Sequence, residues 1–386
     1  MKHSRKLLLG LGAAAAAGAL ALSGCSSSAP SGGGTSSAET LIPVKLQLQW
    51  VAQAQFAGYY AALDQGFYKD EGLDVTIVPA GTDTVPIDEL TAGNVDFAIS
   101  WVPKVLGSIE KGAAVTDVAQ IYERSGTLQI SFKDKGITSP ADLKGKKVGS
   151  WGYGNQWELF AGMQKAGIDT TPSAGQFTLV QQAFDMNGFL AGDIDAAQAM
   201  TYNEYAQVLE TVNPATGKLY TPDDLNVIDW NEEGTAMLQD AIWADANRLA
   251  SDTQYQDVTE KFIKASIEGW MYARDNPQAA ADIVTAAGST LGTSHQLWMT
   301  NEVNKLIWPS KNGVGLINKD EWDQTVDIAL NTKDDTGATI ITTDPPATAY
   351  DNTYVQKALD ELKAEGLDIN GADWKPIEVE LKEGGN

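Results

Sequence analysis

The chain is 386 residues long and 43% hydrophobic, which is enough apolar material for two folded lobes. Its net charge of −24 argues against DNA, RNA or anionic lipid as partners, and weakly against the attraction of free anions such as nitrate or sulfonates. A single cysteine, Cys25, excludes an intrachain disulfide, and the two histidines, His3 and His295, are too few for the usual zinc sites.

Residues 1–24 have the pattern of a secretory signal peptide. Three basic residues precede the apolar run 7–22, which is too short and too rich in alanine and glycine to predict a membrane span. The run ends in Leu-Ser-Gly-Cys, which resembles a bacterial lipobox, so Cys25 is predicted to carry lipid. Residues 25–43 are assigned to this lipidated cysteine and a flexible linker, because they are rich in serine and glycine.

Strands and helices alternate from residue 44 onward, which is typical of an α/β fold. Residues 44–50 alternate apolar and polar side chains and therefore predict the first strand. The other elements predicted up to residue 122 are strands at 74–78, 97–100 and 115–122, and helices at 56–65, 88–92 and 102–111.

A second unit is predicted to begin near residue 128. Its elements are a short helix and a strand within 139–149, strands at 177–180 and 196–200, and helices at 157–166, 184–191 and 202–210. After residue 230 the pattern is mostly helical, with helices at 255–274, 277–287, 295–306, 319–330 and 350–364. We expect one lobe of residues 44–128 plus 234–386, interrupted by a second lobe of residues 129–233. Crossovers near 128–132 and 229–234 would form a hinge.

Ligands of open α/β sheets bind beyond the carboxyl ends of the strands, so the residues that follow each predicted strand are candidates for a site. Four such segments contain aromatic and amide side chains and neither arginine nor lysine. The candidate ligand-binding residues are Trp50, Gln53, Tyr59, Ser100, Trp101, Trp151, Tyr153, Asn155, Tyr202, Asn203 and Glu204.

These residue types favour a flat heterocycle as ligand, because aromatic rings stack on it and amides or hydroxyls bond to its edges. Glu204 could accept from an exocyclic amine or ring N–H, and is explained equally well as an exposed carboxylate on a helix surface. Any single Trp or Tyr is explained equally well by packing, and Trp101 and Trp157 are the strongest cases for facing a core. A pocket for a bare inorganic anion is expected to contain Arg or Lys instead.

Gly149, Gly152 and Gly154 have the spacing G-x-x-G-x-G, which differs from the dinucleotide-binding pattern, and no phosphate-loop lysine follows. They are interpreted as turn residues that let the backbone approach a ligand. His295 is interpreted as a surface or core residue, which is the more common role of a lone histidine. A Ser-His-Asp triad built on it is the alternative, but no G-x-S-x-G motif accompanies it.

Four segments resemble substrate-binding proteins of the nitrate/sulfonate/thiamine-precursor class. They are residues 50–81 (WVAQAQFAGYYAALDQGFYKDEGLDVTIVPAG), 137–149 (ITSPADLKGKKVG), 184–204 (FDMNGFLAGDIDAAQAMTYNE) and 307–315 (IWPSKNGVG). Within this class, residues 50–59 and 202–204 look most similar to members that bind thiamine pyrimidine precursors or riboflavin.

The resemblance implies a two-lobed, hinged periplasmic-binding-protein fold of type II-like architecture, with no metal, cofactor or catalytic residue. It implies a monomer outside the cytoplasm, anchored to the bacterial cell membrane through Cys25, that delivers a small heterocycle to the permease and ATPase of an ABC importer. A nitrate-, sulfonate- or taurine-binding protein of the same fold is an alternative. Another is a thiamine pyrimidine synthase, a family that uses a pyridoxal phosphate lysine, a histidine substrate and a Cys-rich iron motif. This sequence has no such cysteine motif and no histidine near the candidate segments.

Overall fold

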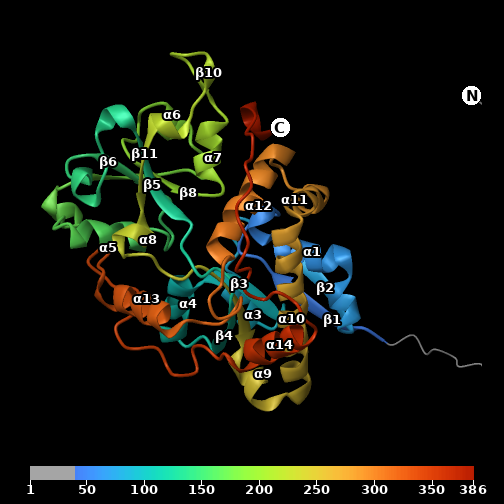
Figure 1. Ribbon diagram of the computed structural model, residues 1–386. Coiled ribbons are helices and arrows are strands. Elements are labelled where there is room, and N and C mark those ends of the chain that lie inside the picture. Colours follow the sequence, from blue (N-terminus) through green and yellow to red (C-terminus); the bar gives the residue numbers. More distant parts are fainter. Residues whose placement is uncertain (1–39) are drawn as a thin grey trace, which may run out of the picture. The chain divides into compact units, whose positions relative to one another are not determined.

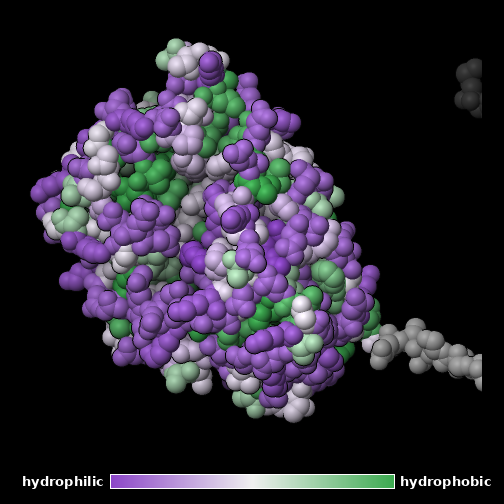
Figure 2. Space-filling view, in the orientation of Figure 1, coloured by the Kyte–Doolittle hydropathy of each residue, from purple (hydrophilic) through white to green (hydrophobic). Residues whose placement is uncertain are grey.

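The computed structural model describes residues 40–386, which form one compact unit. The predicted signal peptide, Cys25 and most of the linker lie outside the described residues. A search of the helices in residues 40–386 finds none with the length and apolar content needed to span a membrane. Hydrophilic side chains cover most of the face seen in Figure 2, and the hydrophobic residues on it form separate patches.

Five strands form the sheet of the first lobe, in the order β2-β1-β3-β12-β4. Figure 1 labels β1, β2, β3 and β4 of this sheet. They are β1 (Ile42–Gln47), β2 (Leu73–Val78), β3 (Phe97–Trp101), β4 (Val115–Gln120) and β12 (Asp240–Asp245). β1 is parallel to β2 and β3, whereas β12 is antiparallel to both of its neighbours. The carboxyl ends of β1, β3 and β4 therefore lie at the same edge of the sheet as the amino end of β12.

Helices cover the first sheet and complete the first lobe. They are α1 (Ala57–Gln65), α2 (Phe67–Asp70), α3 (Pro86–Thr91), α4 (Val102–Glu110), α9 (Ala246–Ser251), α10 (Thr253–Asp275), α11 (Pro277–Ala286), α12 (Thr293–Ile307), α13 (Lys319–Asn331) and α14 (Thr353–Ala364). α1 packs closely on the long helix α10. A Cβ atom at Gly269 would lie only 2.0 Å from the carbonyl oxygen of Gly58, so this crossing requires glycine.

The second lobe contains an antiparallel sheet and a parallel strand pair. The sheet has the order β11-β5-β8, with β5 at Thr127–Phe132, β8 at Ala197–Met200 and β11 at Leu225–Asp229. The pair consists of β6 (Lys147–Ser150) and β7 (Thr178–Gln181), and a bridge between Val148 and Ala196 joins it to the sheet. The remaining elements are α5 (Trp157–Lys165), α6 (Asn187–Leu190), α7 (Glu204–Leu209), α8 (Trp230–Glu233) and the short hairpin β9 (Val212–Asn213) and β10 (Lys218–Leu219).

The predicted α/β, two-lobed fold is confirmed, and most predicted elements begin and end within a few residues of the observed ones. Strands β5, β9, β10, β11 and β12 were not predicted. Almost every residue of β5 and β12 is buried, so neither of these two shows the alternation of apolar and polar side chains that marks a half-buried strand. The chain passes between the sheets at residues 121–126 and 230–239. The exact lobe boundaries at residues 128/129 and 233/234 stay a prediction.

Hydrogen bonds tie the two connections between the lobes to each other. The backbone N–H of Ser125 donates to Oδ1 of Asn231 at 3.0 Å, and Nδ2 of Asn231 donates to the carbonyl oxygen of Ser125 at 2.8 Å. Nε2 of Gln239 donates to Oγ of Ser125 at 3.0 Å. The carboxylate of Glu158 accepts from Oγ of Ser125 at 2.9 Å and from the N–H of Met237 at 2.6 Å. These bonds fix how the connections lie side by side.

Candidate functional site

A buried carboxylate, Asp240, lies at the edge of the first sheet where β1, β3 and β4 end. It is 1% exposed and pairs with Trp101 in the sheet register. Nε1 of Trp101 donates to Asp240 Oδ1 at 2.7 Å, Nε2 of Gln55 donates to Oδ2 at 3.0 Å, and Gln49 is a third donor. Burial raises the pKa of Asp240 to about 7, and the hydrogen bonds from Gln55 and Trp101 oppose that rise. Asp240 thus orients one indole and two amides at this edge.

A small hollow lies between the two lobes beside Trp101. About 210 Å³ of it is not filled by protein atoms, but its enclosed part has room for only about one water molecule. Trp101 and Pro103 line it from the first lobe, and Gly154, Asn155 and Trp157 line it from the second. The lobes are therefore closed against each other here, and a heterocycle needs them to move apart.

Lys104 lies in the first turn of α4, three residues after Trp101. Its Nζ is 4.9 Å from the centroid of the Trp101 ring, and its side chain runs past Gly154 of the second lobe. Burial lowers the pKa of Lys104 to about 8, opposed by the attraction of the Asp240 carboxylate. Within residues 40–386, the ammonium group has no hydrogen-bond or ion-pair partner.

Three aromatic rings from both lobes lie next to each other. Trp50, just after β1, is 4.8 Å from Phe184 between ring centroids. Phe184 in turn stacks on Trp151, just after β6, at 6.2 Å. Phe184 is 39% exposed, whereas Trp151 is buried and its indole N–H has no partner among the described residues. Trp50 and Trp151, both predicted from the sequence, are thus brought together through Phe184, which was not predicted.

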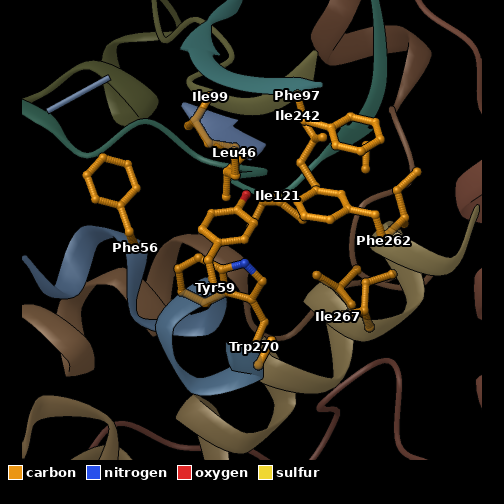
Figure 3. Close-up of a cluster of buried hydrophobic side chains, with 14 of the residues drawn as sticks. Leu46, Phe56, Tyr59, Phe97, Ile99, Ile121, Ile242, Phe262, Ile267 and Trp270 are labelled. Carbon is orange, nitrogen blue, oxygen red and sulfur yellow. The ribbon is translucent and has the colours of Figure 1, made fainter. Parts of the chain in front are cut away.

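Several other predicted residues are packed inside the protein. Tyr59 is 1% exposed and its ring meets Trp270 edge-on at 5.5 Å, within the core shown in Figure 3. Tyr202 is buried as well, with its ring 6.5 Å from that of Tyr122. Ser100 is buried in β3, and Gln53 donates to Oε1 of Gln55 at 2.7 Å.

The glycine-rich loop after β6 forms a tight turn. Gly152, Tyr153 and Gly154 have φ angles of 67°, 52° and 83°, which glycine adopts readily and tyrosine rarely. The turn role predicted for Gly152 and Gly154 is confirmed, whereas Gly149 lies within β6, so the turn role predicted for it is wrong. Nδ2 of Asn155 donates to the carbonyl oxygen of Gly152 at 2.7 Å and so closes the turn. Tyr153 is 80% exposed, so most of its side chain faces solvent.

Asn203 and Glu204 belong to a contact between α7 of the second lobe and α12 of the first. Glu204 accepts from the N–H of Met200 at 2.9 Å and from Nδ2 of Asn203 at 3.0 Å. His295 Nε2 lies 3.1 Å from Oδ1 of Asn203, and Nδ1 lies 2.9 Å from both carboxylate oxygens of Glu210. Both ring nitrogens of His295 therefore lie within hydrogen-bonding distance of oxygen atoms.

Glu204 is 3% exposed, so the interpretation of this residue as an exposed surface carboxylate is wrong. Burial raises its pKa to about 7, with the hydrogen bond from Met200 as the main opposing effect. His295 is fully buried and is therefore a core residue. Among residues 40–386 there is also no cluster of three or more His, Cys, Asp or Glu side chains that could hold a metal ion.

Residues 53–280, more than half of the chain, match a protein family described as NMT1/THI5 like. The chain is 25% identical over 251 residues to the formylaminopyrimidine-binding protein of Halalkalibacterium halodurans, covering 64% of this chain and 72% of that protein. It is 25% identical over 263 residues to the riboflavin-binding protein RibY of Chloroflexus aurantiacus, covering 67% and 70%.

A relative with a different kind of name is 4-amino-5-hydroxymethyl-2-methylpyrimidine phosphate synthase of Aspergillus parasiticus. It is 23% identical over 249 residues, covering 63% of this chain and 70% of the synthase. Among solved structures, the putative periplasmic sulfonate-binding protein SsuA of Methylobacillus flagellatus superposes with a TM-score of 0.57 at 18% identity. That superposition covers 89% of this chain and 99% of SsuA, and shows that the fold is shared.

Proposed function

Because the chain belongs to the NMT1/THI5-like family, we propose that it is a solute-binding protein that captures a small planar heterocycle between its two lobes. Its mechanism would be a closure of the second lobe onto the first about the paired connections at residues 121–126 and 230–239. Ligand binding drives such a closure only through contacts that exist in the closed form alone. The bonds among Ser125, Asn231 and Gln239 would keep the connections together while the lobes move.

The observation that carries this proposal is the meeting of aromatic rings from both lobes. Trp50 of the first lobe contacts Phe184 of the second, and Phe184 stacks on Trp151. Rings contributed by both lobes can hold a flat ligand on two sides, and each aromatic pair adds about 0.5–1.5 kcal/mol beyond the buried area. Trp101, held by Asp240, would extend this surface beside the hollow. Of the residues predicted from the sequence, Trp50, Trp101, Trp151 and Asn155 fit this ligand site best.

The relatives suggest which heterocycles to consider first. Their names refer to formylaminopyrimidine and to riboflavin, so a thiamine pyrimidine precursor or riboflavin is the leading candidate. A nitrate, sulfonate or taurine ligand is the alternative for the same fold, and the ammonium of Lys104 beside Trp101 would favour a negatively charged group.

The proposed role places the protein outside the cytoplasm. The lipobox-like segment supports a lipid anchor on Cys25 at the bacterial cell membrane, and the chain would act as a monomer that delivers its ligand to an ABC permease and its ATPase. We propose that it is not an enzyme, although several relatives are named synthases. His295, the one histidine beyond residue 3, is committed to Glu210 and Asn203, which supports a binding role.

The proposal is tested by thermal unfolding of the purified protein with riboflavin, thiamine, pyrimidine precursors, nitrate and taurine. A ligand at about 100 times its Kd stabilises the native state by about 2.7 kcal/mol, which raises the Tm by several degrees. We expect this rise with riboflavin or a pyrimidine. A rise with nitrate or taurine alone would contradict the heterocycle, and no rise with any of them would contradict the binding role.

A further inference from the structure

The charged groups that face the space between the lobes differ in whether they already have partners. Asp240 accepts hydrogen bonds from Trp101, Gln55 and Gln49. Glu158 is likewise occupied, by Ser125 and Met237. Lys104 alone among these groups has no hydrogen-bond or ion-pair partner within the described part of the chain, and its ammonium lies over the ring of Trp101.

An ammonium group that is partly withdrawn from water gains most from an oxygen anion, because a charge-assisted hydrogen bond is about twice as strong as a neutral one. Lysine is a compact point charge with three donors and binds phosphate in many sites. Lys104 projects from the first turn of α4 toward the loop of the second lobe that carries Gly154. An oxyanion placed there would touch both lobes and so would favour closure.

We propose that Lys104 binds an oxyanion substituent, such as a phosphate or carboxylate, carried by the planar ligand. This inference rests on the proposed function, since the rings of Trp50, Phe184 and Trp151 would hold the heterocycle itself. Lys104 lies just outside the strand-end segments, which contain neither arginine nor lysine. A heterocycle with a charged substituent would use both the ring surface and the unpaired lysine, whereas a bare anion would use only the lysine.

The test compares matched ligand pairs by isothermal titration calorimetry on the purified protein. One pair is riboflavin and riboflavin 5′-phosphate, and the other is hydroxymethylpyrimidine and its phosphate. Taurine, nitrate and inorganic phosphate are added as free anions. We expect the phosphorylated member of at least one pair to bind about tenfold tighter or more than its neutral partner, the gain typical of a hydrogen bond to a charged group.

Variants of two lysines on the same helix assign the effect to one side chain. Lys104→Met keeps the length and apolar stem but removes the charge, so it should abolish the preference for the phosphorylated ligand. Lys104→Arg should retain part of that preference. Lys111, exposed at the far end of α4, is the matched control, and Lys111→Met should leave both affinities unchanged.

Three outcomes separate this inference from the proposed function. If the neutral heterocycle binds as tightly as the phosphorylated one and Lys104→Met changes neither, the inference is overturned and the proposed function stands. If only free anions bind, and Lys104→Met abolishes that binding, Lys104 is an anion site and the heterocycle is overturned. If none of the compounds binds, both are overturned.

Discussion

Two groups of polar residues lie between the lobes, and they differ in how completely their hydrogen bonds are satisfied. In the first, which we call the helix contact, Asn203, Glu204, Glu210 and His295 join α7 to α12, and each side chain has a direct partner. In the second, the cleft group of Trp101, Lys104, Trp151 and Asp240, neither the ammonium of Lys104 nor the indole N–H of Trp151 has a hydrogen-bond partner among residues 40–386, although the Lys104 ammonium lies over the ring of Trp101.

Buried polar groups in folded proteins are almost always hydrogen-bonded, so an unsatisfied one calls for an explanation. The helix contact needs none, because its residues satisfy one another and thereby hold α7 against α12. The cleft group is where a ligand would supply the missing partners. The comparison predicts that changes to the helix contact act on stability, whereas changes to the cleft act on binding.

The largest effect is expected from removing the imidazole of the helix contact. His295→Leu should lower the free energy of unfolding by about 3–5 kcal/mol, because it leaves the carboxylate of Glu210 buried without its partner. Urea denaturation measures this loss. The double variant His295→Leu/Glu210→Gln should recover part of it, since no buried charge is then left unpaired. A loss below about 1 kcal/mol in the single variant would contradict the role given to this contact.

A smaller effect, on affinity instead of stability, is expected in the cleft. Trp50→Ala should weaken binding of riboflavin or its phosphate by about 1–3 kcal/mol, because it removes a stacking surface. The unfolding free energy should change little, since Trp50 is only partly buried. Trp298 is the matched control, because its indole donates to the carbonyl oxygen of Thr201 across the helix contact. Trp298→Phe should reduce stability and leave the affinity unchanged. Unchanged affinity in Trp50→Ala would remove Trp50 from the site.

The pH dependence of stability tests three buried carboxyls: Glu204 of the helix contact, Asp240 of the cleft group, and Glu158, which bonds to the connections between the lobes. Burial raises the pKa of Asp240, Glu158 and Glu204 to about 7 from ordinary values of 3.8 or 4.5. Between those values the native protein binds more protons than the unfolded chain, so the free energy of unfolding should fall as the pH rises from about 4.5 to 7. The stability that the protonated carboxyls contribute is fully present below the pKa of these groups in the unfolded chain. It is lost as the pH rises through their pKa in the native protein.

Thermal unfolding at a series of pH values measures that slope. Glu204→Gln should flatten it by on the order of 1 kcal/mol across the window, because one of the three buried carboxyls no longer titrates. A Tm that rises steadily from pH 5 to pH 7.5 would contradict this prediction, because it would show that ionisation of these carboxyls does not destabilise the native protein.

The smallest effect is expected from Tyr153, the predicted ligand residue whose ring is 80% exposed. Tyr153→Ala should change stability by no more than about 0.5 kcal/mol and leave ligand affinity as it is. Calorimetry and thermal unfolding of the same sample measure both quantities. A clear loss of affinity would mean that the loop closes over the ligand and that Tyr153 joins the cleft group.

The sequence by itself was enough to predict the α/β class, the two lobes and most helices and strands, because amphipathic periodicity and turn residues are local properties. It also predicted the turn role of Gly152 and Gly154, which the positive φ angles confirm. The strand-end rule selected Trp50, Trp101 and Trp151, and the structure brings these residues to the space between the lobes or into contact with Phe184.

Only the tertiary structure decided which polar groups have hydrogen-bond partners and which have none. Asp240 was missed because it begins an antiparallel strand, and a search of carboxyl ends passes over the amino end that shares the same edge. Lys104 was missed because it lies within a helix, beyond the strand-end segments. Asn203 and Glu204 could not be assigned to the helix contact from sequence, since their partner His295 is 92 residues from Asn203 along the chain. Hydrogen-bond satisfaction depends on residues far apart in sequence, and it appears only when the chain has folded.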